Sequence, residues 1–133
     1  MINLLLYLAF FCGASSDLTV NISGIESIKG SVYIAVFTDR DSFPVFGKQW
    51  RGESISVTEK SMSYTFKNIL HGTYAIAVFH DENDNGVMDK NALGIPLEPY
   101  GFSQNARARF SAPPFKDAQF ELKGKKSIHI SIH

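Results

Sequence analysis

After residue 17 the chain alternates apolar and polar residues with a period of two along most of its length. Because successive side chains of a β-strand point to opposite faces, this pattern predicts strands with one buried and one exposed face. Apolar residues do not recur every three to four positions over any ten-residue segment, so we expect no long helix. The pattern predicts seven strands, at residues 18–23, 31–39, 54–58, 61–67, 73–80, 119–122 and 128–133.

Two of the predicted strands, at 31–39 and 73–80, are apolar on both faces. We therefore expect them at the centre of a sheet whose two faces are both covered. Residues 68–72 form a short connection between the fourth and fifth strands and predict a hairpin. Seven short strands with turn residues between them are typical of a sandwich. The predicted fold is all-β, an antiparallel β-sandwich of about seven strands.

Residues 81–117 interrupt the alternation without becoming a polar linker. The segment contains apolar, aromatic and proline residues: Leu93, Ile95, Pro96, Pro99, Tyr100, Phe102, Phe110, Pro113, Pro114 and Phe115. A connection of this length without secondary structure is uncommon in a compact domain and is usually functional. We expect a long ordered loop after the fifth strand, packed on the sandwich.

Residues 1–16 form an apolar run that ends in small residues, which is typical of a secretory signal. The run is shorter than the roughly 20 apolar residues that span a bilayer. We predict a signal peptide at 1–16, a single domain at 17–133 without a transmembrane span, and a secreted or periplasmic location. The only cysteine, Cys12, lies in the signal. The mature domain would therefore lack disulfides and thiolate metal sites.

The charge balance and the motifs narrow the possible functions. The 133 residues include 13 Lys and Arg and 13 Asp and Glu, for a formal net charge of zero. A broad nucleic-acid surface needs a basic excess, so we expect no nucleic-acid partner. The sequence has no nucleophile elbow, no His-Glu-x-x-His zinc motif and no phosphate-binding glycine loop. We predict that the protein is not an enzyme and that its partner is an unknown envelope or extracellular ligand.

The segment Asp81–Asp89 is the strongest candidate for chemistry in the chain. Aligned with a twelve-position calcium loop, it places side-chain oxygens at positions 1, 3, 5 and 9, a backbone carbonyl at 7 and Gly86 at 6. The predicted metal ligands are Asp81, Asn83, Asn85, Val87 through its carbonyl, and Asp89. This spacing predicts a structural Ca²⁺ site.

The loop departs from the usual calcium pattern at position 12, where Ala92 stands in place of a bidentate glutamate. The loss of those oxygens predicts weak binding, with a dissociation constant of roughly 10⁻⁴–10⁻³ M. Glu98 is the nearest downstream carboxylate that could compensate. The alternative is a turn without a metal, because Asn, Asp and Gly favour turns for backbone reasons alone.

A second candidate is a ligand surface between residues 98 and 107. Its residues are Glu98, Tyr100, Phe102, Asn105 and Arg107. They combine ring faces with polar groups that could hold a sugar or a peptide. The alternative is that both rings pack on the sandwich while Arg107 pairs with Glu98.

Several motifs carry a resemblance to a known family. They are Gly30–Phe37, Gly72–Asn83, Asn85-Gly86, Gly94-Ile95-Pro96, Tyr100–Ser103 and Pro113-Pro114-Phe115. Through them nearly the whole mature chain closely resembles the bacterial secreted family known only as domain of unknown function 2141 (DUF2141). The resemblance implies an exported protein with a transthyretin-like or immunoglobulin-like sandwich, and it implies no activity. The chain departs from the family pattern at Ala112, where a glycine often precedes the prolines.

Three functional hypotheses follow from the sequence. The first is an exported binding or structural module of the cell envelope, in which Ca²⁺ fixes the long loop. The second is a carbohydrate- or peptide-binding module that uses the aromatic part of the loop. The third is an envelope hydrolase with Glu98 in its site, which needs a second carboxylate at about 5–10 Å across a cleft.

Overall fold

The computed structural model describes residues 13–109 and 111–133. Most of the predicted signal lies outside the described residues, as do Cys12 and Phe110. The described strands are β1 (Ser15–Ser23), β2 (Ser31–Phe37), β3 (Arg51–Ser56), β4 (Met62–Leu70), β5 (Gly72–Asp81), β6 (Tyr100–Phe102), β7 (Phe120–Leu122) and β8 (Lys126–Ser131). Two short helices, the 3₁₀-helix η1 (Ser103–Asn105) and α1 (Phe115–Ala118), complete this part of the chain. None of its helices is long and apolar enough to cross a membrane.

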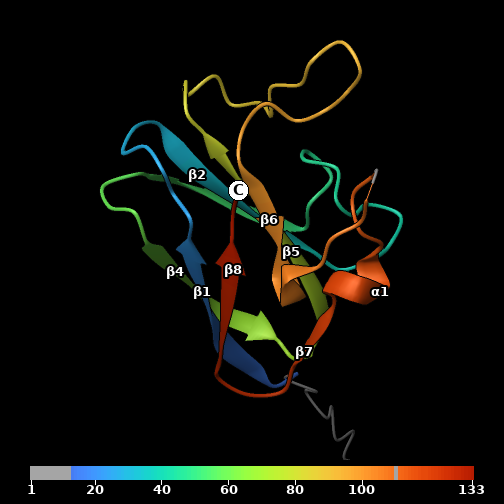
Figure 1. Cartoon of the computed structure of the whole chain (residues 1–133). Coiled ribbons are helices and arrows are strands. Elements are labelled where there is room, and N and C mark those ends of the chain that lie inside the picture. The colour runs from blue at the N-terminus through green and yellow to red at the C-terminus, as the bar shows by residue number, and fades with distance from the viewer. Residues whose placement is uncertain (1–12, 110) are drawn as a thin grey trace, which may run out of the picture.

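The strands form two packed sheets, which confirms the predicted β-sandwich (Figure 1). The small sheet has the order β4-β1-β8, and the large sheet has the order β3-β2-β5-β6, with β7 also paired to β5. The strand pairs are antiparallel as predicted, except that β1 and β8 run parallel. Alternation specifies which face of a strand is buried but not the direction of its neighbour.

All seven predicted strands are present, and an additional strand, β6, lies inside the region expected to be a loop. β6 has three residues centred on Gly101, so it is too short for periodicity to reveal. A Cβ atom on Gly101 would collide with the backbone carbonyl of Ser131. This glycine therefore allows β6 to lie against the end of β8.

The connection between β4 and β5 is not the expected hairpin. β4 pairs with β1 in the small sheet, whereas β5 pairs with β2 in the large sheet, so the chain crosses between sheets at His71. The prediction failed because the inward side chains of both strands, such as Phe66 and Tyr74, enter one shared core. Periodicity describes each of these strands correctly without indicating which sheet it joins.

Two apolar clusters explain why β2 and β5 are apolar on both faces. The first fills the space between the sheets. The second covers the outer face of the large sheet, where the Phe43 ring lies 5.3 Å from that of Phe37 and 5.8 Å from that of Phe115 in α1. Burying a side chain of this size contributes about 1.5–3 kcal/mol. The prediction that both strands are covered on both sides is confirmed.

β6 joins the two sheets along one side of the sandwich. The His133 amide donates to the Tyr100 carbonyl over 3.2 Å, and the Tyr100 amide donates to the His133 carbonyl over 3.4 Å. The residues after β8 are therefore linked through β6 to β5 (Figure 1). This link fixes the end of the long loop that begins at Asp81.

The buried hydroxyl of Ser103 completes the hydrogen bonding of β5 between its neighbours β6 and β7. The Ile76 amide donates to Ser103 Oγ over 2.9 Å, and this hydroxyl donates to the Ala118 carbonyl over 2.5 Å. Ser103 has no exposed surface, so water cannot replace either bond. One side chain therefore ties β5 to the segment that enters β7.

We expect Ser103→Ala to lower the free energy of unfolding by about 1–3 kcal/mol, because it leaves the buried Ile76 amide and Ala118 carbonyl unpaired. Urea unfolding followed by circular dichroism measures the change. The exposed Ser111 lies in the same connection, and Ser111→Ala should change stability by less than about 0.5 kcal/mol. Equal loss in both variants would contradict the special role of Ser103.

Candidate functional site

The site is built on the loop that leaves β5 at Asp81 and returns at β6. Its two ends are held together at the base, where the His80 amide donates to the Pro99 carbonyl over 2.9 Å. Between these points the loop extends beyond the strands, as the gold segment at the top of Figure 1 shows. The five predicted metal ligands and Glu98 all lie within this loop.

Asp81 organises the first half of the loop. Its side chain is buried, and its carboxylate accepts hydrogen bonds from the amides of Gly86 over 2.8 Å and Asn85 over 3.3 Å. The turn needs left-handed backbone at Asp84, with φ of 52°, and at Gly86, with φ of 78°. Glycine adopts that conformation without steric cost. The chain therefore curls around the Asp81 carboxylate, as the spacing of the calcium pattern requires.

The two asparagines face the inside of the same curl. Asn83 Oδ1 accepts from the Asn85 amide over 3.2 Å, and Asn85 Oδ1 accepts from the Val87 amide over 3.0 Å. A carbonyl oxygen has two lone pairs, so each can accept an amide proton and still contact a cation. The Val87 side chain points into solvent, with 58% of its surface exposed.

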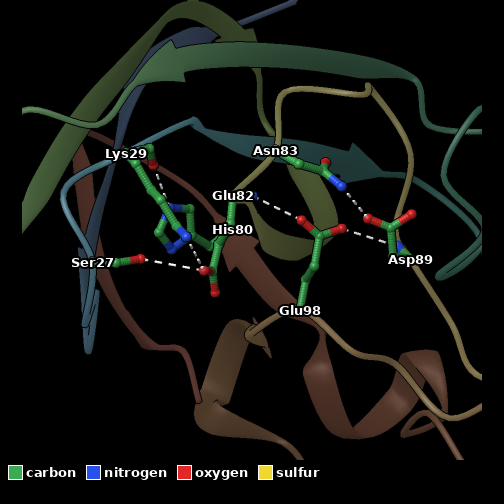
Figure 2. Close-up of polar contacts among 7 residues, drawn as sticks. All are labelled: Ser27, Lys29, His80, Glu82, Asn83, Asp89 and Glu98. Carbon is green, nitrogen blue, oxygen red and sulfur yellow. Dashed lines mark hydrogen bonds and ion pairs between the residues drawn. The ribbon is translucent and has the colours of Figure 1, made fainter.

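Asp89 closes the loop on the opposite side. Its carboxylate accepts from Asn83 Nδ2 over 2.8 Å (Figure 2). It also accepts from Asn85 Nδ2 over 2.8 and 3.0 Å. These hydrogen bonds, with those from Asn85 the largest cause, hold the pKa of the Asp89 carboxyl below its ordinary value. The structure thus brings the four predicted side-chain ligands into one hydrogen-bonded cluster.

Glu98 has a role that the sequence did not indicate. Its Oε2 atom accepts from the Glu82 amide over 2.7 Å, and its Oε1 atom accepts from the Asp89 amide over 2.9 Å (Figure 2). The residue is only 7% exposed, so one buried carboxylate joins the start of the loop to its second half. Burial raises the pKa of Glu98, and the negative charges of Asp89 and Asp81 raise it further. The two backbone amides act in the opposite direction.

The chemistry of this cluster suits a hard cation, although its geometry is closed by hydrogen bonds. Carboxylate, amide and backbone oxygens are the donors that Ca²⁺ takes. No ion pair joins Asp81, Asp89 or Glu98 to a basic side chain in the described part of the chain. No set of three or more His, Cys, Asp or Glu side chains there is grouped as a metal site. A cation would therefore depend on the Asn and backbone oxygens and would displace the amide groups that now contact Asp89.

The neighbouring residues Glu82 and His80 fasten the loop to the β1–β2 connection. Glu82 Oε2 accepts from Ser27 Oγ over 3.3 Å and lies 3.5 Å from Lys29 Nζ (Figure 2). His80 is fully buried and its Nε2 lies 2.7 Å from the Lys29 carbonyl, so this nitrogen carries the proton and donates. His80 Nδ1 has no hydrogen-bond partner among the described residues. Gly30, with φ of 65°, packs so closely on the Asp81 carbonyl that a Cβ atom would collide with it.

The predicted ligand surface is only partly assembled. Tyr100, Phe102, Asn105 and Arg107 line one cavity of about 110 Å³, and Ser111 and His133 also contribute to its wall. Glu98 lies outside this cavity. The Tyr100 and Phe102 rings cross at 68° with centroids 5.7 Å apart, so they do not form one flat stacking face.

The alternative, in which Arg107 pairs with Glu98, is wrong. Arg107 donates instead to His133 Nδ1 over 2.6 Å. Glu98 is occupied by the backbone amides of Glu82 and Asp89. The sequence could not indicate that Arg107 contacts His133, because the contact arises only where the segment after β6 lies beside the end of β8.

Comparison with known proteins gives a family but no characterised relative. A family model described as "Uncharacterized protein conserved in bacteria (DUF2141)" matches residues 20–130. Neither a curated protein nor a solved structure matches the chain. The chemistry of the site therefore has to be argued from its own geometry.

In the metal-free protein we expect nuclear magnetic resonance to give a titration midpoint for Glu98 above the ordinary pKa of 4.5. Since the pKa is raised in the folded state, the stabilising effect of protonated Glu98 is complete below pH 4.5 and is lost as the pH rises through the folded-state pKa. Asp89→Asn should lower the midpoint, because it removes a neighbouring negative charge.

Glu121 is the matched control for that titration. The hydrogen bond and charge of Lys123 lower its pKa, so its midpoint should lie below 4.5 and should not respond to Asp89→Asn. A Glu98 midpoint at or below 4.5 would show that the two amide hydrogen bonds outweigh burial.

Proposed function

We propose, for a chain that belongs to the DUF2141 family of uncharacterized bacterial proteins, a role as an exported β-sandwich module with a structural Ca²⁺ site. The site comprises Asp81, Asn83, Asn85, the Val87 carbonyl and Asp89. The module would serve as a binding or structural component of the cell envelope. One observation carries the proposal, namely that these side chains converge in one loop around Asp81 and Asp89.

The electrostatics of the loop support this proposal. Asp81, Asp89 and Glu98 are close enough that the charges of the first two raise the pKa of the third. A divalent cation among these groups would offset their mutual repulsion, which a metal-free turn leaves in place. The absence of the glutamate at position 12 makes weak binding the expectation, at roughly 10⁻⁴–10⁻³ M.

A non-catalytic role fits the way in which Glu98 is held. Both of its carboxylate oxygens accept hydrogen bonds from backbone amides. A carboxyl group that transfers a proton to a substrate needs a free oxygen directed into a cleft. Glu98 is therefore better suited to positioning the loop than to acting in an envelope hydrolase.

Export is compatible with the first strand of the fold. β1 begins at Ser15, where it pairs with Leu70, and the Ala14 carbonyl accepts from the His71 amide. The predicted signal at 1–16 includes only Ser15 and Ser16 of β1, so the pairs that β1 makes from Leu18 onward with β4 and β8 would remain in the mature protein. A location outside the cytoplasm would also supply Ca²⁺ at the concentration that a weak site needs.

Calcium should stabilise the folded protein measurably. At a Ca²⁺ concentration about ten to one hundred times the dissociation constant, the free energy of unfolding should rise by about 1–3 kcal/mol. This corresponds to an increase of several degrees in Tm, measured by differential scanning calorimetry against a chelated sample.

Asp81→Asn and Asp89→Asn should each abolish most of that increase, because each removes a ligand charge while keeping the side-chain size. Asp84→Asn is the matched control, since Asp84 lies in the same loop but outside the predicted ligand set. Equal Tm values with chelator and with excess Ca²⁺ would refute the site. If Asp84→Asn also lost the Ca²⁺-dependent rise in Tm, the rise would be due to the overall negative charge of the loop and not to the predicted ligands.

A second candidate function is supported by the cavity beside β6. Its lining combines the Arg107 guanidinium, His133 and Ser111 with the Tyr100 ring, and it has no carboxylate side chain. A guanidinium next to an aromatic ring suits a small acidic group on a sugar or a peptide. This function requires only the cavity and is independent of the Ca²⁺ loop.

We expect binding to an array of acidic glycans and short acidic peptides, and we expect Arg107→Ala to weaken it by about tenfold or more. Lys116→Ala, which removes an exposed cation on α1 away from the cavity, is the control and should leave binding unchanged. An array without any bound ligand would count against this candidate.

A further inference from the structure

Four large aliphatic side chains are exposed on one short stretch of the loop. Residues 87–97, here called the aliphatic finger, carry Val87 at 58% exposure, Leu93 at 84%, Ile95 at 55% and Leu97 at 64%. Exposed apolar residues scattered singly over a surface are normal, but a group on one projection indicates an interaction site. The finger is part of the segment that extends beyond the strands in Figure 1.

The finger is held in an ordered shape that keeps these side chains exposed. Its two sides meet at an isolated β-bridge between Lys90 and Pro96, and the Asn91 amide donates to the Ile95 carbonyl over 2.9 Å. At the tip, Asn91 Oδ1 accepts from the amides of Leu93 over 2.9 Å and Ile95 over 3.0 Å. Gly94, with φ of 76°, completes the turn. Hydrogen bonds within the finger therefore hold its backbone in a conformation that leaves the apolar side chains exposed.

The base of the finger is attached directly to the proposed Ca²⁺ loop. The Leu97 amide donates to the Asp89 carbonyl over 2.7 Å, and the Asp89 amide donates to Glu98. A shallow groove is lined by residues of both parts: Glu82, Asn83, Asp89, Lys90, Leu97 and Glu98. Any ligand that moves Asp89 would thus act on the finger.

We propose that the aliphatic finger inserts into the interface of an anionic lipid membrane when the adjoining loop holds Ca²⁺. The inference rests on the proposed Ca²⁺ site and adds a partner to it. Aliphatic side chains enter the boundary between headgroups and acyl chains, while the cation attracts the lipid phosphates. A single apolar anchor gives marginal attachment, so the two contacts act together.

The charges of the loop explain why Ca²⁺ controls this attachment. Residues 81–98 include five carboxylate side chains and one lysine, Lys90. This excess of negative charge repels an anionic surface at short range. One Ca²⁺ in the proposed site offsets two of these four net negative charges, which weakens the repulsion, and Lys90 contributes attraction.

The composition and shape of the finger favour a lipid over a folded protein as the partner. Its exposed large apolar side chains are all aliphatic, whereas the residues that dominate protein interfaces are Trp, Tyr and Arg. A stable protein interface buries about 800 Å² on each partner, which a narrow projection with four aliphatic side chains does not supply. A fluid lipid interface needs no matching groove and closes around any convex apolar tip.

Sedimentation with lipid vesicles tests the inference. The probes are vesicles of phosphatidylcholine alone and vesicles of phosphatidylcholine with phosphatidylglycerol, each with Ca²⁺ or with chelator. We expect the protein to sediment with the phosphatidylglycerol vesicles in Ca²⁺ and to lose this binding by about tenfold or more in chelator. Leu93→Ser combined with Ile95→Ser should cause a similar loss, while Tm still rises with Ca²⁺.

Leu70→Ser is the matched control, because Leu70 is also exposed, at 54%, but lies in β4. It should leave vesicle binding unchanged. Equal binding to neutral vesicles, binding that resists chelator, or full binding by the double variant would each overturn the inference. So would a wild-type dimer that becomes a monomer in the double variant, since the tip would then join two copies of the chain.

Calorimetry separates failure of this inference from failure of the Ca²⁺ site. If Ca²⁺ raises Tm but no vesicle binds, the lipid inference is wrong and the metal site stands. If Ca²⁺ has no effect on Tm and binding is insensitive to chelator, both are wrong.

Discussion

The loop depends on one buried carboxylate that joins backbone groups from its two halves. Glu98 accepts from the Glu82 amide, where the chain leaves β5, and from the Asp89 amide, near the start of the finger. Burial makes the ionised form of this group costly, and the two amides offset part of that cost. Asp89 is thereby placed opposite Asp81, and the turn between them is closed by two asparagines. The position of the candidate site follows from this contact.

The same arrangement gives one projection two properties that are usually separated. Its base concentrates negative charge around Asp81 and Asp89, and its tip exposes aliphatic side chains. Each feature alone has a plain structural explanation, since acidic turns and exposed apolar residues are both common. Because a hydrogen bond between Leu97 and Asp89 connects the two features, we interpret them as parts of one functional site. The loop is fastened independently to the sandwich through Glu82 and His80, so it is a defined surface.

Sequence reasoning succeeded where a property is local. The alternation in β1 and β8 and the two-faced apolar character of β2 and β5 follow from which side chains are buried. The spacing of Asp81, Asn83 and Asn85 likewise identified a turn whose oxygens face inward.

Sequence periodicity could not predict which distant segments pair with one another. The parallel neighbour of β1, the crossing at His71 and the three-residue strand β6 all depend on which segments meet in space. The contact of Arg107 with His133 and the use of Glu98 as a clamp belong to the same class. A charged residue in a sequence indicates possible chemistry, whereas its burial against a particular amide is decided only by the tertiary fold.

The parallel pair of β1 and β8 has a consequence for the order of folding. β1 is the middle strand of the small sheet, and one of its two neighbours comes from near the opposite end of the sequence. A chain that emerges amino end first therefore lacks half of the hydrogen bonds of that strand until about residue 131 is free. The small sheet is therefore completed only when β8 is available, whereas the pairing of β2 with β3 and β5 requires no residue after Asp81.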